Sequence, residues 1–234
     1  MEIIGVLGGM SWESTAEYLR LLNQGVRDRL GGLHSARLRV ATVDFAQIEH
    51  LQATNNWPAA GQILAREAAD LEAAGATLIL IATNTMRKVY DTIAAAVTVP
   101  VLHLGDVTAN AVRAQGLTHI GLLATRYTME QTFYTNRLTH HGIQTLVPDA
   151  SARTEIQRII YTELCVGLVS QPSRQSLIHI ANDLITQGAQ GIVLGCTELE
   201  LTLTASDLPV PVFPTTTLHC TAALDHAVQN PAAN

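Results

Sequence analysis

The chain has 234 residues, of which 47% are apolar and 15% charged, enough for one large domain or two small lobes with a proper core. Its formal net charge of −6 argues against non-specific nucleic-acid binding, which needs a basic surface. No basic segment followed by an apolar one opens the chain, and no apolar run approaches the roughly 20 residues of a membrane span, so we expect a cytoplasmic protein without nucleic-acid or membrane partners.

Apolar runs alternate with longer amphipathic segments along the whole chain. We expect strands at residues 3–8, 38–45, 77–82, 100–104, 119–124, 143–148, 191–195 and 210–213. Between them we expect helices at residues 14–29, 58–74, 86–96, 107–115, 129–140, 152–166 and 173–187, and a short helix after residue 195. Alternation of this kind predicts an α/β fold with parallel strands and helices on both faces of the sheet.

Two stretches of the chain resemble copies of one unit. Residues 75–86 read GATLILIATNTM and residues 188–200 read GAQGIVLGCTELE, so each has a small-residue turn, an apolar run and a short polar motif. The apolar segments ahead of them, 3–9 and 120–125, also match. A duplicated half-fold predicts two pseudo-symmetric lobes, each a parallel sheet flanked by helices, with the active site between the lobes.

The lobe boundaries follow from this internal match. We expect residues 1–100 and 210–234 in the first α/β lobe and residues 101–209 in the second. Ligands of open α/β sheets bind beyond the carboxyl ends of the strands. The segments predicted at those ends are Gly8–Ser11, Asp44–Gln52, Thr83–Thr85, Thr125–Thr128 and Cys196–Glu198.

The cysteine and lysine content limits the cofactors that we expect. The three cysteines, Cys165, Cys196 and Cys220, lack the close spacing of a disulfide framework or a zinc site, and no histidine pair has supported metal-ligand spacing, so we expect no metal. A pyridoxal-phosphate enzyme needs a Schiff-base lysine. The one lysine, Lys88, lies among helix-like surface residues, so we expect no cofactor of this kind either.

Cys196 is the strongest candidate for chemistry. It follows an apolar strand and precedes a short helix, where the helix dipole and free backbone N–H groups favour a thiolate that can act as a base. The alternative is a buried structural cysteine, which is how we interpret Cys165 and Cys220 within their helical patterns. Thr83 holds the equivalent position in the first copy, although a threonine there, taken alone, is most often a helix cap.

Several other polar residues and glycines lie near the predicted strand ends. Each has an ordinary structural explanation as well as a functional one. Gly5, Gly8 and Gly9 form Gly-x-x-Gly-Gly, which is not the full dinucleotide fingerprint, and close backbone approach to a small ligand explains them equally well. Gln52 is predicted in the loop after the second strand, near the mouth of the cleft. Arg126 and Arg87, interpreted as surface residues, would attract a dianionic substrate, although surface arginines usually stay solvated.

Four motifs resemble the aspartate/glutamate racemase family, and most closely its enterobacterial aspartate/glutamate-specific members. They are GVLGGMSWEST at Gly5–Thr15, TNTM at Thr83–Met86, TRYTMEQTFY at Thr125–Tyr134 and GCTE at Gly195–Glu198, and the resemblance covers nearly the whole chain. It implies a cofactor-independent enzyme, usually a homodimer, in which one residue from each of two lobes flanks the α-carbon of a dicarboxylic amino acid.

The resemblance also implies roles for individual residues. Carried over by motif, Thr83 and Cys196 are the catalytic pair, and the substrate contacts are Met10, Gln52, Asn84, Thr85, Thr125, Thr197 and Glu198. Most of the family has cysteine where this chain has Thr83, whereas the enterobacterial members carry threonine. Because a hydroxyl is a far weaker acid than a thiol, we expect a direction-biased 1,1-proton transfer, with Cys196 the better base and Thr83 the better donor.

Other functions of the same scaffold stay open at this point. Relatives with only one such cysteine include decarboxylases of substituted malonates, and relatives with two include hydantoin racemases and maleate isomerases. A protein that only binds an amino acid is a further alternative, although solute receptors usually carry export signals. The TNTM and GCTE motifs favour the racemase.

Overall fold

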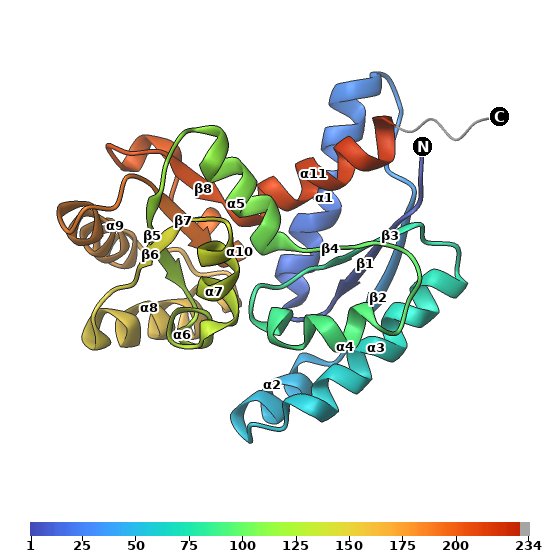
Figure 1. Ribbon diagram of the computed structural model, residues 1–234, viewed down its shortest axis with the longest axis horizontal. Helices are drawn as coiled ribbons and strands as arrows, with labels where there is room; N and C mark the ends of the chain where they lie inside the picture. The colour runs from blue at the N-terminus through green and yellow to red at the C-terminus, as the bar shows by residue number, and fades with distance from the viewer. Residues whose placement is uncertain (230–234) are drawn as a thin grey trace. The chain divides into compact units, whose positions relative to one another are not determined.

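Each half of the chain builds its own four-stranded parallel sheet. The computed structural model describes residues 1–229 (Figure 1), and this part of the chain divides into two compact units: Met1–His103 with residues 219–229, and Leu104–Leu218. Both sheets arrange their strands in the order second, first, third, fourth. The expected α/β fold of two similar lobes, each a parallel sheet flanked by helices, is therefore confirmed.

The first unit alternates strands with helices. Its strands are β1 (Ile4–Gly8), β2 (Leu38–Thr42), β3 (Leu78–Ile81) and β4 (Val101–Leu102). Its helices are α1 (Trp12–Leu30), α2 (Phe45–Ala53), α3 (Trp57–Ala73), the 3-10 helix η1 (Thr85–Val89), α4 (Tyr90–Ala94) and most of the C-terminal α11 (Thr215–Gln229). The helices α1 and α11 cover one face of the sheet, and α3 and α4 lie on the other (Figure 1).

An apolar layer joins α1 and α11 to the first sheet. Tyr18, Leu22 and Val26 recur every four residues along α1, so they share one face of the helix, and all three are buried. They form one cluster with Leu224 of α11 and with residues of β1 and β3. Gly25 allows the two helices to approach closely, because a Cβ at this position would lie 2.3 Å from Leu224 Cδ1.

The second unit repeats this plan. Its strands are β5 (His119–Ala124), β6 (Gln144–Leu146), β7 (Ile192–Gly195) and β8 (Val212–Pro214). Its helices are α5 (Leu104–Ala114), α6 (Arg126–Glu130), α7 (Thr132–His140), α8 (Ala150–Thr162), η2 (Leu164–Val166), α9 (Gln171–Thr186), α10 (Thr197–Glu200) and η3 (Ala205–Asp207). The strand β5 pairs with β7 just as β1 pairs with β3, so the first and third strands are neighbours in both sheets.

Two helices were not expected from the sequence, and three expected helices are each divided into two elements. The segment 86–96 forms η1 and α4, and the segment 152–166 forms α8 and η2. Residues 45–53 form α2 rather than a loop, because the Asp44 carboxylate caps this helix by accepting from the Ala46 N–H. The C-terminal α11 was also missed. The segment 129–140 is interrupted at Gln131, whose extended backbone separates α6 from α7.

The boundaries of the units differ from those of the expected lobes. Residues 101–103 belong to the first unit, because β4 pairs with β3. Residues 210–218 belong to the second, because β8 pairs with β7. The expected first lobe also included residues 230–234, which lie outside the described residues.

A carboxylate from α10 caps the start of α11. Glu200 Oε1 accepts from the Thr216 N–H at 2.6 Å, and Oε2 accepts from the N–H and the hydroxyl of Thr217 at 3.3 and 3.2 Å. Burial raises the pKa of Glu200 to about 7, although these hydrogen bonds oppose the shift. Glu200 therefore gains a proton in the folded protein near neutral pH.

This raised pKa predicts a pH dependence of stability. Between the unfolded value of 4.5 and about 7, the folded state holds more protons than the unfolded state, so the free energy of unfolding falls as the pH rises. The stabilisation from protonated Glu200 is fully present below pH 4.5. It falls as the pH rises to about 7, and the total loss is about 3 kcal/mol. Denaturant unfolding of Glu200→Gln and wild type at several pH values measures it. A stability difference that does not change between pH 5 and 8 contradicts the prediction.

Candidate active site

All predicted site residues except Gln52 lie at the carboxyl ends of strands, in one group for each unit. In the first unit, Met10 follows β1 and Thr83–Thr85 follow β3. Because β1 and β3 are paired, both segments lie at the same edge of the sheet. In the second unit, Thr125 follows β5, and Cys196–Glu198 follow its neighbour β7. The structure thus brings each group together within its own unit.

The Thr83–Thr85 motif is a tight turn between β3 and η1. The Thr83 N–H donates to Ile81 O at 2.9 Å, and the Arg87 N–H donates to Asn84 O at 3.2 Å. Asn84 and Thr85 are buried, whereas Thr83 is half-buried. The backbone of the turn therefore fixes the motif, and Thr83 is its most accessible member.

Arg87 is not the solvated surface residue that the sequence indicated. Its side chain is only 3% exposed and donates to two backbone carbonyls, Leu102 O at 3.0 Å and Ile81 O at 2.8 Å. These carbonyls belong to the last residues of β4 and β3. Arg87 therefore places a buried positive charge beneath the edge of the sheet that carries the Thr83–Thr85 motif.

A buried histidine of α11 completes this polar cluster. His219 Nδ1 lies 3.5 Å from Arg87 Nη2 and 2.9 Å from the Tyr18 hydroxyl, and Nε2 lies 3.0 Å from Leu102 O. Burial lowers the pKa of His219 far below its ordinary value, and the charge of Arg87 adds to this shift. The ring is therefore neutral, with Nε2–H donating to Leu102 O and Nδ1 accepting from Tyr18 and Arg87.

Gln52 lies on α2 and is buried, not in a loop at the mouth of a cleft. Only 4% of its surface is exposed, and its amide Nε2 donates to Met86 Sδ at 3.0 Å. Met86 belongs to the TNTM motif, so Gln52 joins α2 to the end of β3. Met10 is also buried, at 6% exposed, and the Met10–Ser11 peptide bond is cis.

Internal packing accounts for Gly8, the last residue of β1, and for Gly9, which follows it. A Cβ on Gly8 would lie 2.4 Å from Thr15 Oγ1, and one on Gly9 would lie 2.4 Å from Val43 O. Gly9 also has a positive φ of 85° and donates its N–H to Thr15 Oγ1 at 2.8 Å. These two glycines thus let the start of α1 and the end of β2 meet the β1 turn, which explains them without a nucleotide.

Cys196 holds its proton, contrary to the expectation of a thiolate. The side chain is 7% exposed, and Sγ donates to Glu198 Oε2 at 2.9 Å. Burial is the main cause that raises its pKa well above the ordinary value, and the negative charge of Glu198 is the next. Cys196 is the N-cap residue of α10, but its side chain makes no capping hydrogen bond, and a helix of a single turn has a weak dipole. The loss of water and the carboxylate therefore decide the direction of the pKa shift.

The carboxylate of Glu198 is held between two thiols. It is 5% exposed and lies beside Cys196 through Oε2, while Oε1 accepts from Cys165 Sγ at 3.7 Å. Cys165 was interpreted as structural, and no local sequence pattern could have linked it to Glu198, since 33 positions separate them. The structure therefore adds Cys165 to the group around Cys196.

Threonine hydroxyls surround both strand ends of the second unit. Thr125 Oγ1 lies 3.2 Å from Thr128 Oγ1 at the start of α6, and Thr197 Oγ1 lies 3.1 Å from Thr216 Oγ1. All four side chains are buried. These hydroxyls can donate to a carboxylate at the sheet edge, in addition to their contacts within the protein.

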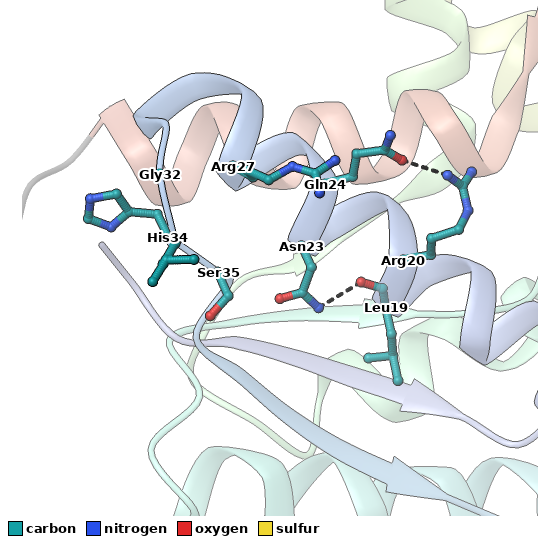
Figure 2. Close-up of a pocket in the computed structure, with 9 residues that line it drawn as sticks. Leu19, Arg20, Asn23, Gln24, Arg27, Gly32, His34 and Ser35 are labelled. Carbon is teal, nitrogen blue, oxygen red and sulfur yellow. Dashed lines mark hydrogen bonds between the residues drawn. The ribbon is translucent and has the colours of Figure 1, made fainter.

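A separate surface pocket of about 730 Å³ lies in the first unit (Figure 2). One face of α1 and the loop after it line this pocket, and none of the predicted site residues does. Its Arg20 is already paired with the Glu17 carboxylate at 2.6 Å and with Gln24 Oε1 at 2.6 Å. The positive charge of Arg20 in this pocket is therefore already balanced by the Glu17 carboxylate.

The described part of the chain has neither a metal-binding cluster nor a helix that could span a membrane. Among residues 1–229, no three His, Cys, Asp or Glu side chains come close enough to hold a metal ion, and no helix has the length and apolar character needed to cross a membrane. Lys88 lies with Nζ 4.1 Å from the centroid of the Trp57 ring, and burial lowers its pKa. It is half-buried against this ring rather than on an open surface.

Two solved structures resemble this chain over almost its whole length. A protein from Yersinia pestis, provisionally assigned as an Asp/Glu racemase, is 51% identical and has a TM-score of 0.91, covering 98% of this chain and 100% of that one. An aspartate racemase homologue from Pyrococcus horikoshii OT3 is 30% identical with a TM-score of 0.87, covering 97% of this chain and 100% of that one. Both have the fold described above.

A curated relative and a family model complete the comparison. An uncharacterised protein from the pnlA 3′ region of Pectobacterium carotovorum subsp. carotovorum is 32% identical over 98 residues, which is 42% of this chain and 64% of that relative. The match thus spans less than two thirds of the relative's length. The model of the Asp/Glu/hydantoin racemase family matches residues 7–223, which include every strand-end segment described above. The chain therefore belongs to the Asp/Glu/hydantoin racemase family.

Proposed function

We propose that the protein is a cofactor-independent racemase of aspartate, glutamate or both, with Thr83 and Cys196 as its two proton carriers. The observation that carries the proposal is the equivalence of their positions. Thr83 follows β3 and Cys196 follows β7, which are the third strands of two sheets with the same strand order. Family membership supports an isomerase, and a pair of equivalent residues suits proton transfer on opposite faces of one α-carbon.

In this proposal, Glu198 activates Cys196. The thiol is protonated at rest, so its proton must leave before sulfur can remove the α-hydrogen. Glu198 Oε2 already accepts this proton in a hydrogen bond of 2.9 Å and can take it over. The thiolate then removes the α-hydrogen and becomes a thiol again. After this direction Glu198 gives its extra proton to water, and Thr83, which has protonated the carbanion, takes one back from water. In the reverse direction Thr83 removes the α-hydrogen, the Cys196 thiol gives its proton to the carbanion, and the thiolate left behind takes a proton from water while Thr83 gives one up.

Thr83 faces the opposite electrostatic environment. Its N–H and the Arg87 guanidinium both contact Ile81 O, so a buried positive charge lies near the threonine. Such a charge favours negative charge on the substrate carboxylate and on the hydroxyl after it gives up its proton. Even so, an alcohol remains a weak acid, and we propose that Thr83 mainly donates. This makes the reaction direction-biased.

The substrate carboxylates need donors at the two strand ends. We propose that Asn84 and Thr85 in the first unit, and Thr125 and Thr197 in the second, supply them, with Met10 and Gln52 shaping the site. These side chains are buried at the edges where the proton carriers lie, so their donors are already oriented. The resemblance to the racemase family further implies a cytoplasmic homodimer, and sedimentation velocity measures the oligomeric state.

The alternative is a decarboxylase of substituted malonates, because that reaction needs one thiol and this chain has cysteine only in the second motif. After carbon dioxide leaves, Cys196 would protonate the carbanion, and Thr83 would have no chemical role. Incubation with substituted malonates beside aspartate and glutamate separates the two activities.

Substitution of each proton carrier tests the proposal. In D₂O the wild type exchanges the α-hydrogen of aspartate or glutamate for deuterium and loses chirality. Cys196→Ala lowers turnover by about 10²-fold or more, because the thiol is removed from one face. Thr83→Ala stops racemisation but still exchanges one enantiomer with retention, through Cys196 alone. Proton NMR and chiral chromatography measure both.

The buried Cys220, in the α1–α11 cluster, provides the matched thiol control. We expect Cys220→Ala to keep wild-type turnover. Full turnover by Cys196→Ala would remove the thiol from the mechanism, and racemisation by Thr83→Ala at the wild-type rate would remove the threonine.

Substitution of Glu198 tests its role as the acceptor of the thiol proton. Glu198→Gln keeps the size of the side chain but removes the acceptor for the thiol proton, so kcat falls by about 10²-fold while KM changes little. The same variant removes a negative charge that raises the pKa of Cys196, so alkylation of Cys196 begins at lower pH. Glu200→Gln, on the same helix, is the control and keeps wild-type activity. Equal activity of the two variants rules out Glu198 as the proton acceptor.

A further inference from the structure

We propose that Cys165 is a positioning residue, which holds the Glu198 carboxylate in line with Cys196. The inference rests on the proposed function, because it concerns the same proton acceptor. Its starting point is that the two oxygens of one buried carboxylate each accept from a thiol. Cys196 donates to Oε2 at 2.9 Å, and Cys165 donates to Oε1 at 3.7 Å.

A contact on each oxygen limits rotation of the carboxylate. With Cys196 alone, the group could turn about its last bond and present either oxygen, or neither, to the thiol. The second donor, from η2, favours the orientation in which Oε2 faces Cys196. A proton transfer needs this alignment to within a few tenths of an ångström. Groups that support a reacting side chain usually serve to hold such an alignment.

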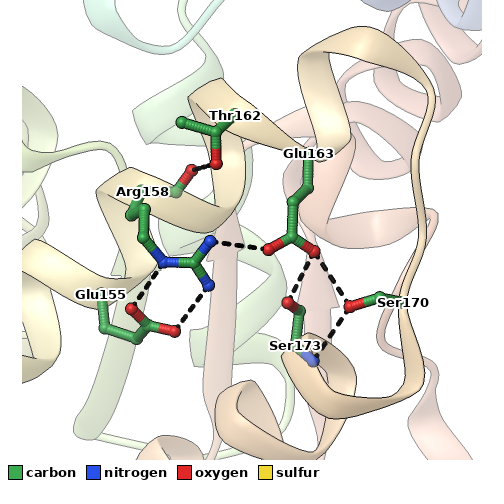
Figure 3. Close-up of polar contacts among 6 residues, drawn as sticks. All are labelled: Glu155, Arg158, Thr162, Glu163, Ser170 and Ser173. Carbon is green, nitrogen blue, oxygen red and sulfur yellow. Dashed lines mark hydrogen bonds and ion pairs between the residues drawn. The ribbon is translucent and has the colours of Figure 1, made fainter.

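The segment that carries Cys165 is fixed by a polar clamp (Figure 3). Glu163, between α8 and η2, accepts from the hydroxyls of Ser173 at 2.6 Å and Ser170 at 3.0 Å, and from Arg158 Nη1 at 2.8 Å. Arg158 is held in turn by both oxygens of Glu155, at 2.8 Å each. The hydrogen bond from Ser173 is the largest cause that keeps the pKa of Glu163 below its ordinary value, so the clamp is charged at neutral pH.

The same residue shapes the backbone around Cys165. The carbonyl of Glu163 accepts from the N–H groups of Val166 at 3.1 Å and Leu168 at 2.9 Å, and Gly167 closes the turn with a φ of 76°. Leu164 is buried and Cys165 packs against the apolar core, whereas Val166, Leu168 and Val169 are 62%, 59% and 55% exposed. The hydrogen bonds of Glu163 therefore help to hold η2, which has a single turn and is followed by exposed apolar residues.

The first experiment reads the alignment without any assay of turnover. Iodoacetamide alkylation of Cys196, followed by mass spectrometry over a range of pH, is compared in wild type, Cys165→Ala and Cys165→Ser. If Cys165 holds Glu198 against Cys196, alanine releases the carboxylate, and the Cys196 profile moves to lower pH by roughly one unit. Serine keeps a donor, so its profile stays near that of the wild type. No shift in Cys165→Ala, or equal shifts in both variants, overturns the inference.

The second experiment isolates the step that uses Cys196. In the Thr83→Ala background, deuterium exchange depends on Cys196 alone, and we expect Cys165→Ala to slow this exchange by about tenfold and serine to restore it. The substrate KM and the melting temperature should change little, and Cys220→Ala is the control. The positioning role is overturned if Cys165→Ala and Cys165→Ser slow the exchange equally, or if a raised KM accounts for the slower exchange.

The two experiments separate the inference from the proposed function. If wild type exchanges no α-hydrogen of aspartate or glutamate but the alkylation profile moves as expected, the racemase proposal fails and the positioning of Glu198 stands. If wild type racemises its substrate and neither the profile nor the exchange responds to Cys165→Ala, the racemase stands and the inference fails.

Discussion

The buried guanidinium of Arg87 holds together the part of the first unit that carries the Thr83–Thr85 motif. It joins the last carbonyls of β3 and β4 and lies beside His219 of α11, which bonds in turn to Tyr18 of α1. A charge without water must keep its hydrogen bonds, because the loss of any one leaves it poorly compensated. Two strands and two helices are therefore fixed relative to one another at the carboxyl edge of the sheet.

The second unit has a buried group of the opposite charge at the equivalent place. Its equivalent strand end carries the buried carboxylate of Glu198, which lies against the thiols of Cys196 and Cys165. A positive charge near an alcohol stabilises anions, whereas a negative charge near a thiol receives a proton. Two halves with one strand order thus offer different chemical environments, which fits the different acidities of Thr83 and Cys196.

The fold could be predicted from the sequence because its signal is local and repeated. Fully apolar strands alternate with amphipathic helices, and residues 119–124 match β5 without error. The helix α2 was missed because its nine residues give only a short pattern. Partners that lie far apart in sequence left no such signal: Arg87 meets His219 across 132 positions, and Cys165 meets Glu198 across 33. The protonated state of Cys196 was mispredicted for the same reason, since desolvation is a property of the folded environment.

The single lysine gives the molecule an unusually simple amine chemistry. Lys88 sits on η1, next to Arg87 and five positions beyond Thr83, with its ammonium over the Trp57 ring. One isotopically enriched ammonium would thus give one resonance, whose frequency is shifted by the ring current of the indole. Any ligand that displaces η1 would alter that frequency, so the enriched side chain reports on the position of η1 without any substitution or chemical modification of the protein.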